Sequence, residues 1–282
     1  MEGILVVNKP AGYTSHDIVS KIRKQLNIKK VGHTGTLDPL ATGVLPILLG
    51  NGTKLSKYLM NHNKKYIATI KLGEKTESGD LEGKVIEQKE VPSLSKEQVQ
   101  AVLTNFKGKQ KQIPPMYSAI KVNGKKLYEY ARNGEMVVVE PREIEIYNIE
   151  LIGYQLKEIK FKVECSKGTY IRSLCEDIAE KLGTVGTMSA LQRTQVGEFK
   201  IENAINIEDI ENKQKVRDSL ITPEKLFLDK EKIELTQKEL VHFLNGVKLS
   251  KTCEDGIYRI YVEQKFIGIG EVKGNVLKRE YV

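Results

Sequence analysis

The stretch Lys29–Gly50, KKVGHTGTLDPLATGVLPILLG, combines four glycines, two prolines, one histidine and one carboxylate in a basic part of the chain. Glycines at this density let a backbone approach a ligand closely. Asp38 is the only acidic residue between Asp17 and Glu74. We expect it to be ionised, with its pKa lowered by the surrounding cations. An aspartate before Pro39 is a common turn residue, but an anion inside a basic segment also fits nucleophilic catalysis.

Positive charge is concentrated around this stretch. The 282 residues include 45 Lys and Arg and 37 Asp and Glu, a net charge of +8. Residues 1–75 alone hold twelve basic and four acidic residues, which accounts for the whole excess. A solvated basic face is the plain explanation, whereas the interpretation that we favour is a surface for a polyanion. Composition does not choose between RNA, DNA and a membrane surface.

Other features of the composition exclude several classes. No apolar run is long enough to span a bilayer, and the N-terminus lacks the basic start of a signal peptide. Three cysteines without a CxxC pair predict reduced thiols in the cytoplasm. The four histidines show no metal-ligand spacing, and neither a phosphate loop nor a GxSxG nucleophile elbow occurs. The sequence therefore predicts a globular protein without a metal site.

Outward from Lys29–Gly50, helices and strands mix without a regular alternation. The patterns predict helices after Thr14, over Lys96–Phe106 and from near Arg172 to Gly183. An Asn123-Gly124 hairpin turn is expected, with strands at Ile4–Val7, Tyr66–Leu72, Val137–Val139, Ile144–Ile152 and Ile159–Cys165. This order favours an α+β fold around a mixed, largely antiparallel sheet with flanking helices.

A change of composition divides the chain near its end. Residues 202–232 are polar and are interpreted as a poorly specified connector with short helical pieces. A helix over Thr236–Asn245 and a hairpin of Tyr258–Glu263 with Phe266–Val272 follow. We expect a main domain at 1–230 and a small β-rich module at 231–282, which should dock on the main domain because about fifty residues fold marginally alone.

The segment GHTGTLDPLATGVLPI resembles the signature of the bacterial tRNA pseudouridine-55 synthases. Further blocks match in the same order: GILVVNKPAGYTSHD at 3–17, KKYIATIKLG at 64–73, IPPMYSAIKVNGKKLYEYAR at 113–132 and CSKGTYIRSL at 165–174. The resemblance implies a pseudouridine-synthase fold, with 1–230 as the catalytic domain and 231–282 as a PUA-like RNA-binding module.

The resemblance also implies a reaction. These enzymes isomerise a uridine in the T-loop of tRNA, at position 55, by breaking the N1–C1′ bond and joining C5 to C1′. No atom leaves and no net redox change occurs, so no cofactor and no metal are expected. The base must be flipped out of the loop into a pocket. The implied partner is the tRNA T stem-loop, with no membrane and no obligatory protein partner, and the chain is expected to be a cytoplasmic monomer.

Three catalytic residues follow from the matched motifs. Asp38 in GTLDPLATG matches the nucleophilic aspartate, and Arg172 in GTYIR matches the arginine that pairs with it. Tyr66 matches the tyrosine that stacks on the target base and is a candidate proton acceptor. An ionised carboxylate could attack C1′, attack C6 or assist removal of a sugar proton, and the sequence does not choose among these routes.

Four further positions match residues of the substrate site. Lys9 in NKP corresponds to a basic residue behind the active site, and His33 in GHTG to a histidine near the displaced nucleotide. Tyr170 corresponds to a base-contacting residue, and Leu191 in ALQR to an apolar residue that closes the pocket.

Two other functions remain open at this stage. A non-catalytic RNA chaperone could use the same basic face, although it has no use for an anion there. A guide-RNA-dependent relative would work inside a multi-protein particle and would be inactive alone on a T-arm transcript.

Overall fold

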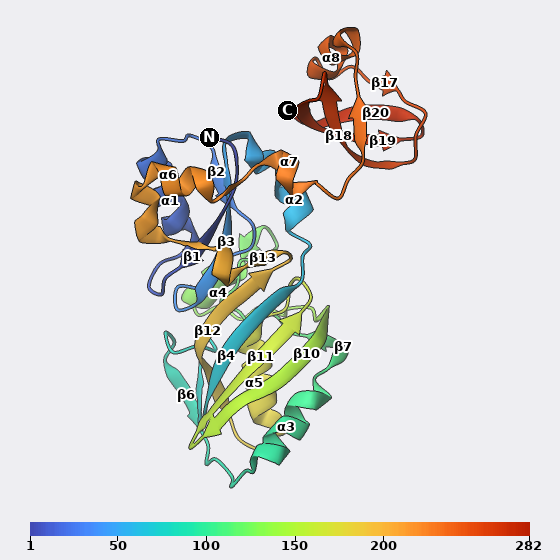
Figure 1. Cartoon of the computed structure of the whole chain (residues 1–282). Helices are drawn as coiled ribbons and strands as arrows, with labels where there is room; N and C mark the ends of the chain where they lie inside the picture. Colours follow the sequence, from blue (N-terminus) through green and yellow to red (C-terminus); the bar gives the residue numbers. More distant parts are fainter.

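The computed structural model describes residues 1–282 and places an elongated body beside a small C-terminal module (Figure 1). The body is built on one mixed sheet with helices packed against it, and the module on a second, smaller sheet. The expected α+β class with a β-rich C-terminal part is confirmed. No helix is long and apolar enough to cross a membrane.

The main sheet has eleven strands, most of them antiparallel. Its central path runs through β14 (Ile205–Asn206), β1 (Gly3–Lys9), β3 (Thr42–Leu49), β12 (Gly186–Val196), β4 (Lys64–Leu72), β11 (Glu158–Cys165), β10 (Arg142–Gln155) and β7 (Gly108–Gln112). Three short strands lie off this path: β2 (Val31–His33) on β3, β13 (Phe199–Lys200) on β12 and β15 (Leu220–Ile221) on β1. Strand β12 pairs in parallel with β3 and antiparallel with β4, so it joins the two halves of the sheet.

Three helices share one core of 36 buried residues with this sheet: α1 (Ser15–Leu26), α3 (Lys96–Asn105) and α5 (Ile171–Lys181). Strand β4 shows how the core forms. Its alternate residues Tyr66, Ala68, Ile70 and Leu72 are buried, as expected for a strand with one face in the core. The capping box predicted for the first helix is present, with Thr14 and Asp17 bonded reciprocally.

Smaller elements border the sheet. Hairpin β5–β6 (Glu74–Thr76, Val85–Gln88) follows β4, and hairpin β8–β9 (Lys121–Val122, Lys125–Lys126) leads into α4 (Leu127–Arg132). The Asn123-Gly124 turn has positive φ at both residues, as that dipeptide predicts. The strand predicted at Val137–Val139 is wrong. Those valines run along the surface without a partner strand, and β propensity alone does not make a strand.

The segment 202–232 has the short helical pieces expected of it, but it also forms strands and is more ordered than a poorly specified connector. It contains β14, β15, η3 (Ile207–Glu211), α6 (Lys213–Asp218) and α7 (Pro223–Leu226). β14 and β15 both pair with β1, while Ile207, Ile210 and Val216 enter the main core. A few apolar residues among many polar ones are enough to fix this segment on the body.

The C-terminal module has a five-stranded sheet in the order β16 (Lys232–Glu234), β18 (Gly256–Val262), β19 (Lys265–Lys273), β20 (Val276–Tyr281) and β17 (Leu249–Ser250). Helix α8 (Gln237–Leu244) and the β18–β19 hairpin lie where the sequence predicts them. The module has its own core of eight residues. It meets the body through a small apolar cluster of Leu55, Phe227, Ile269 and Tyr281, flanked by an ion pair of Lys57 with Glu280.

Candidate active site

A cleft of about 730 Å³ opens beside the junction of β12 and β4. Its walls come mainly from six parts of the chain: the loop between β2 and β3, strand β4, the segment after β5, α4 with the segment before it, the turn into α5, and strand β12. The cleft brings together five of the residues predicted from sequence: Asp38, Tyr66, Tyr170, Arg172 and Leu191. Lys9 and His33 lie outside its lining.

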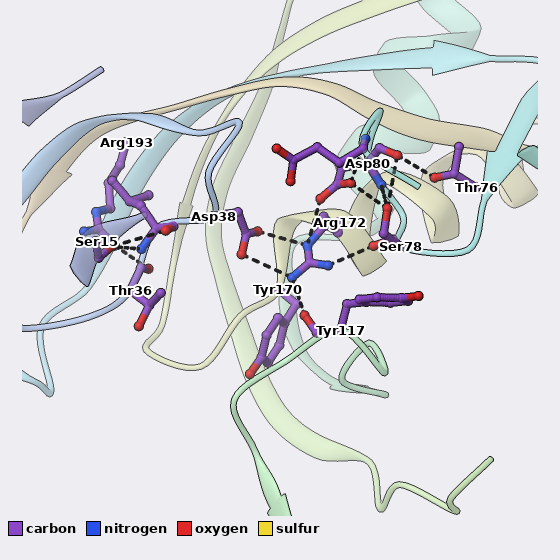
Figure 2. Close-up of polar contacts among 12 residues, drawn as sticks. Ser15, Thr36, Asp38, Thr76, Ser78, Asp80, Tyr117, Tyr170, Arg172 and Arg193 are labelled. Atoms are coloured by element: carbon purple, nitrogen blue, oxygen red, sulfur yellow. Dashed lines mark hydrogen bonds and ion pairs between the residues drawn. The ribbon is translucent and has the colours of Figure 1, made fainter. Parts of the chain in front are cut away.

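Asp38 and Arg172 form a two-point pair (Figure 2). Arg172 Nε lies 3.0 Å from Asp38 Oδ2, and Arg172 Nη2 donates to Asp38 Oδ1 at 3.3 Å. The arginine side chain is 6% exposed and that of Asp38 is 32% exposed, so the carboxylate faces the cleft while its partner is buried. Arg172 lies in the first turn of α5, where the helix dipole disfavours a cation. The nearby Asp38 carboxylate offsets this unfavourable interaction. The fork of the guanidinium fixes the orientation of the carboxylate as well as its charge.

A second carboxylate shares the same arginine. Asp80 Oδ2 lies 3.8 Å from Arg172 Nε, and Ser78 Oγ donates to Asp80 Oδ1 at 2.6 Å. Arg172 also donates to the carbonyls of Ser78 and Tyr117, each at 2.8 Å. The expectation of a solitary anion is therefore wrong. The sequence gives no signal for Asp80, because its Ser-Gly-Asp surroundings are those of any polar turn.

The pKa of Asp38 is raised, which corrects the expectation that cations lower it. Loss of solvent by burial is the largest cause, and nearby Asp80 adds to it. Arg172 and Lys9 act in the opposite direction without overcoming the effect of burial. The charge count along the sequence missed both burial and the second carboxylate.

Arg193 holds the loop that carries Asp38 from the other side. It is 1% exposed and donates to the carbonyls of Val44 at 2.7 Å, Gly35 at 3.0 Å and Thr36 at 3.3 Å. No carboxylate lies within ion-pair distance of it. The ALQR stretch held a usable signal, since Arg193 is two residues after inward-facing Leu191 and so shares its face of the strand.

Close backbone packing accompanies this arginine. Gly43 has φ +102°, and a Cβ at this position would collide with the Arg193 carbonyl. Only glycine allows β3 and β12 to approach in this way at the start of the strand.

Two further side chains support the same loop. Ser15 Oγ accepts from the Leu37 amide at 2.9 Å and donates to the Leu37 carbonyl at 3.2 Å. Lys9 is fully buried behind the loop, and its Nζ donates to the carbonyls of Tyr13 at 2.6 Å and Pro39 at 3.1 Å. Burial lowers the pKa of Lys9 to about 8. Asp38 is thus displayed on a loop whose backbone is fixed on both sides.

The remaining predicted residues have distinct places. Tyr66 is 7% exposed, and burial raises its pKa to about 12 although the Arg193 charge opposes the shift. The backbone of Tyr170 is held by Gln112, which accepts from its amide at 2.8 Å and donates to its carbonyl at 3.0 Å. His33 lies on β2 with Nδ1 unpartnered, and burial together with Arg193 lowers its pKa.

No group of three or more His, Cys, Asp or Glu side chains is arranged to hold a metal ion. The functional groups of the cleft are instead a carboxylate pair bridged by an arginine, a buried tyrosine and apolar walls. This set can hold a planar base and present an anion to it.

Comparison with solved structures places the fold. The chain matches a crystal structure titled as a Cbf5–Nop10–Gar1 complex with a TM-score of 0.73 and 25% identity, over 98% of this chain and 83% of that one. A structure of an H/ACA RNP bound to a substrate RNA containing 2′-deoxyuridine matches in fold with a TM-score of 0.71 at 24% identity, over 99% and 84% of the two chains. The fold is that of the pseudouridine synthases.

Family models and curated relatives are more specific. Residues 23–171 match the TruB family pseudouridylate synthase N-terminal domain, 172–230 the tRNA pseudouridylate synthase B C-terminal domain, and 232–278 the pseudouridine synthase II TruB C-terminal model. tRNA pseudouridine synthase B of Clostridium tetani is 49% identical over 96% of both chains. The protein of the same name from Francisella philomiragia is 45% identical over 100% of this chain and 95% of its own. The chain belongs to the TruB family, and as a member it is an isomerase that converts uridine in tRNA to pseudouridine.

Proposed function

We propose that this chain isomerises the uridine at position 55, in the T-loop of tRNA, with Asp38 as the nucleophile. The observation that carries the proposal is the two-point pair with Arg172, which presents a partly exposed carboxylate to a cleft large enough for a flipped base. A protein that only binds RNA has no use for a carboxylate held in this way, since it repels phosphate.

Base flipping is the first step of the proposed reaction. Removing a base from its stack costs a few kcal/mol. Stacking on Tyr66 would return roughly 1–3 kcal/mol. Leu191 and Tyr170, which also line the cleft, would enclose the pyrimidine. Tyr66 enters the reaction as a neutral phenol because burial raises its pKa.

The isomerisation then breaks one bond and makes one. The N1–C1′ bond breaks, the uracil rotates, and C5 bonds to C1′. The proton lost from C5 is matched by the proton gained at N1, so atoms and electrons balance within the nucleotide. Attack at C1′, attack at C6 and assistance to loss of a sugar proton all require Asp38 to be ionised, and Arg172 favours that form.

RNA binding completes the proposal. The basic segment 1–75 would hold the T arm through its phosphates, while the shape of the loop and the flipped base give specificity. Residues 231–282 would act as a PUA-like RNA-binding module attached to a catalytic domain of residues 1–230. We propose that the monomer works in the cytoplasm on tRNA alone, without a cofactor.

Incubation of the purified chain with an unmodified tRNA transcript, followed by mapping of pseudouridine, tests the substrate. Product at position 55 is expected, and product only at another uridine would contradict the assignment. Activity of the chain alone would also contradict the guide-RNA-dependent alternative.

Asp38→Asn tests the nucleophile. This variant should lose isomerisation while its tRNA affinity stays within a few-fold of the parent. Asp229→Asn, at an exposed carboxylate paired only with Lys230, is the matched control and should keep full activity. Full turnover by Asp38→Asn would contradict the assignment of the nucleophile, whereas tRNA binding by a parent protein that forms no pseudouridine would favour the chaperone.

A further inference from the structure

Strand β4 carries a lysine inside the cleft beside Tyr66. Lys64 and Tyr66 both line the cleft and are two residues apart, so they share one face of the strand at a spacing of roughly 7 Å. The intervening Lys65 points to the other face, where its Nζ lies 3.4 Å from Glu164. Adjacent lysines are therefore used differently, one paired with a carboxylate and the other not.

The charge of Lys64 has no carboxylate partner. Its only hydrogen bond from Nζ goes to the His62 carbonyl at 2.7 Å, which leaves two of its three donors free. Burial lowers the pKa of Lys64 to about 8, and the neighbouring cations Arg193 and Lys167 act in the same direction. An anion placed among these groups would relieve a repulsion that the free protein carries.

The space beside Lys64 is kept open by a glycine. A Cβ on Gly35 would lie 3.9 Å from Lys64 Cε and 3.7 Å from Arg193 Nη1. Gly35 has φ +88° and belongs to the loop that carries Asp38, so the bare backbone of this loop borders the cleft next to Lys64. A larger side chain at this position would fill that space.

The cleft contains two groups of charges. Asp38 and Asp80 lie around Arg172, a region that repels phosphate. Lys64 instead has the cations Arg193 and Lys167 as its charged neighbours. In a nucleotide whose base stacks on Tyr66, the distance from the base to its phosphate is similar to the spacing of roughly 7 Å between Tyr66 and Lys64 along the strand.

We propose that Lys64, assisted by Lys167, forms a phosphate subsite that binds a phosphodiester adjacent to the flipped uridine. The inference rests on the proposed function and deepens it, because it assigns the backbone of the substrate nucleotide to a named cation. Lys64 is a binding residue in this proposal and takes no part in bond breaking.

Lys64→Gln is compared with Lys65→Gln on a T-arm RNA over a range of salt concentrations. Lys64→Gln should raise KM on the order of tenfold, leave kcat within about threefold, and reduce the slope of log affinity against log salt by about 0.7–0.9, the effect of one lost phosphate contact. Lys65→Gln should change each quantity less than twofold, and Lys64→Arg should restore most of the affinity. A fall in kcat with unchanged KM and salt slope would overturn the subsite.

A modified RNA keeps the test independent of folding defects. A methylphosphonate, which is neutral, replaces the phosphate on the 5′ or the 3′ side of the target uridine. One of the two should weaken binding to the parent protein on the order of tenfold and weaken binding to Lys64→Gln by less than twofold. Equal losses in both proteins at both positions would overturn the inference. Pseudouridine mapping with the parent protein and unmodified RNA reports separately on the proposed function.

Discussion

Two buried arginines lie on opposite sides of the Asp38 loop and are used in different ways (Figure 2). Arg172 meets two carboxylates as well as two carbonyls, whereas Arg193 donates only to three carbonyls. The first is placed to set the charge and orientation of Asp38, and the second to fix the backbone from which Asp38 projects. A buried guanidinium without a carboxylate is costly, and three hydrogen bonds offset part of that cost.

The largest effect is expected for Arg172→Met. It leaves Asp38 facing Asp80 without a cation between them, which favours protonation and loses the fixed orientation. Breaking such a pair costs about 3 kcal/mol, and the same loss in the transition state lowers the rate by more than about a hundredfold. Single-turnover assays with saturating enzyme measure it.

Arg172→Lys keeps a charge without the fork and should recover only part of the rate. If Arg172→Met stayed within tenfold of the parent, the pair would be structural and the contrast between the two arginines would fail.

Arg193→Met should act mainly on stability. Three buried carbonyls each lose a hydrogen-bond donor, at a cost of about 1–3 kcal/mol each. Removing a buried charge is favourable and offsets part of this cost. We expect a net loss of about 3 kcal/mol in the free energy of unfolding, measured by urea denaturation, with a fall in kcat on the order of tenfold. Arg193→Lys should have a stability and a kcat between those of the parent and of Arg193→Met. A loss of kcat equal to that of Arg172→Met, at unchanged stability, would remove the distinction.

Ser15→Ala tests the third support of the loop. The Leu37 amide and carbonyl both lose their side-chain partner, and the expected cost is about 1–2 kcal/mol with less than a tenfold change in kcat. Ser15→Thr keeps the hydroxyl and serves as the control in the same denaturation series. If Ser15→Ala lost more stability than Arg193→Met, the main support of the loop would come from α1, which begins at Ser15.

The smallest expected effect is on how the stability of the protein depends on pH. Because burial raises the pKa of folded Asp38 above the model-compound value of 3.8, the folded state binds this proton more tightly than the unfolded chain. Stability of the parent protein therefore falls as pH rises through the folded pKa. Asp38→Asn cannot ionise, so its stability should lack this fall with pH. Urea midpoints of both proteins at pH 7 and below pH 3.8 measure this, and a parent protein that gains stability relative to Asp38→Asn as the pH rises would contradict the direction.

Periodic segments of the chain were predictable, and contacts between distant segments were not. The capping box at Thr14, the apolar face of the α5 helix and the Asn123-Gly124 turn depend on neighbouring residues, and all are confirmed. The strand expected at Val137–Val139 had the right residues but no partner strand.

The site divides in the same way. Motif resemblance located Asp38 and Arg172, and the structure pairs them. Asp80 and the raised pKa of Asp38 depend on which loops meet and on how much water they exclude, and no local pattern encodes either. Arg193 could have been found from its alternation with Leu191, because a charged residue on a buried strand face needs partners.

The position of β12 has a consequence for synthesis on the ribosome. This strand lies between β3 and β4 and supplies both Leu191 and Arg193. Strand β1, near the N-terminus, pairs with β14 and β15, which are translated about two hundred residues later. Chains of such high contact order complete their long-range pairing late. A nascent chain of about 172–185 residues contains Asp38, Tyr66 and Arg172 but lacks strand β12, which borders the cleft. The cleft is therefore incomplete until residue 196 has been translated, long after Asp38 and Tyr66.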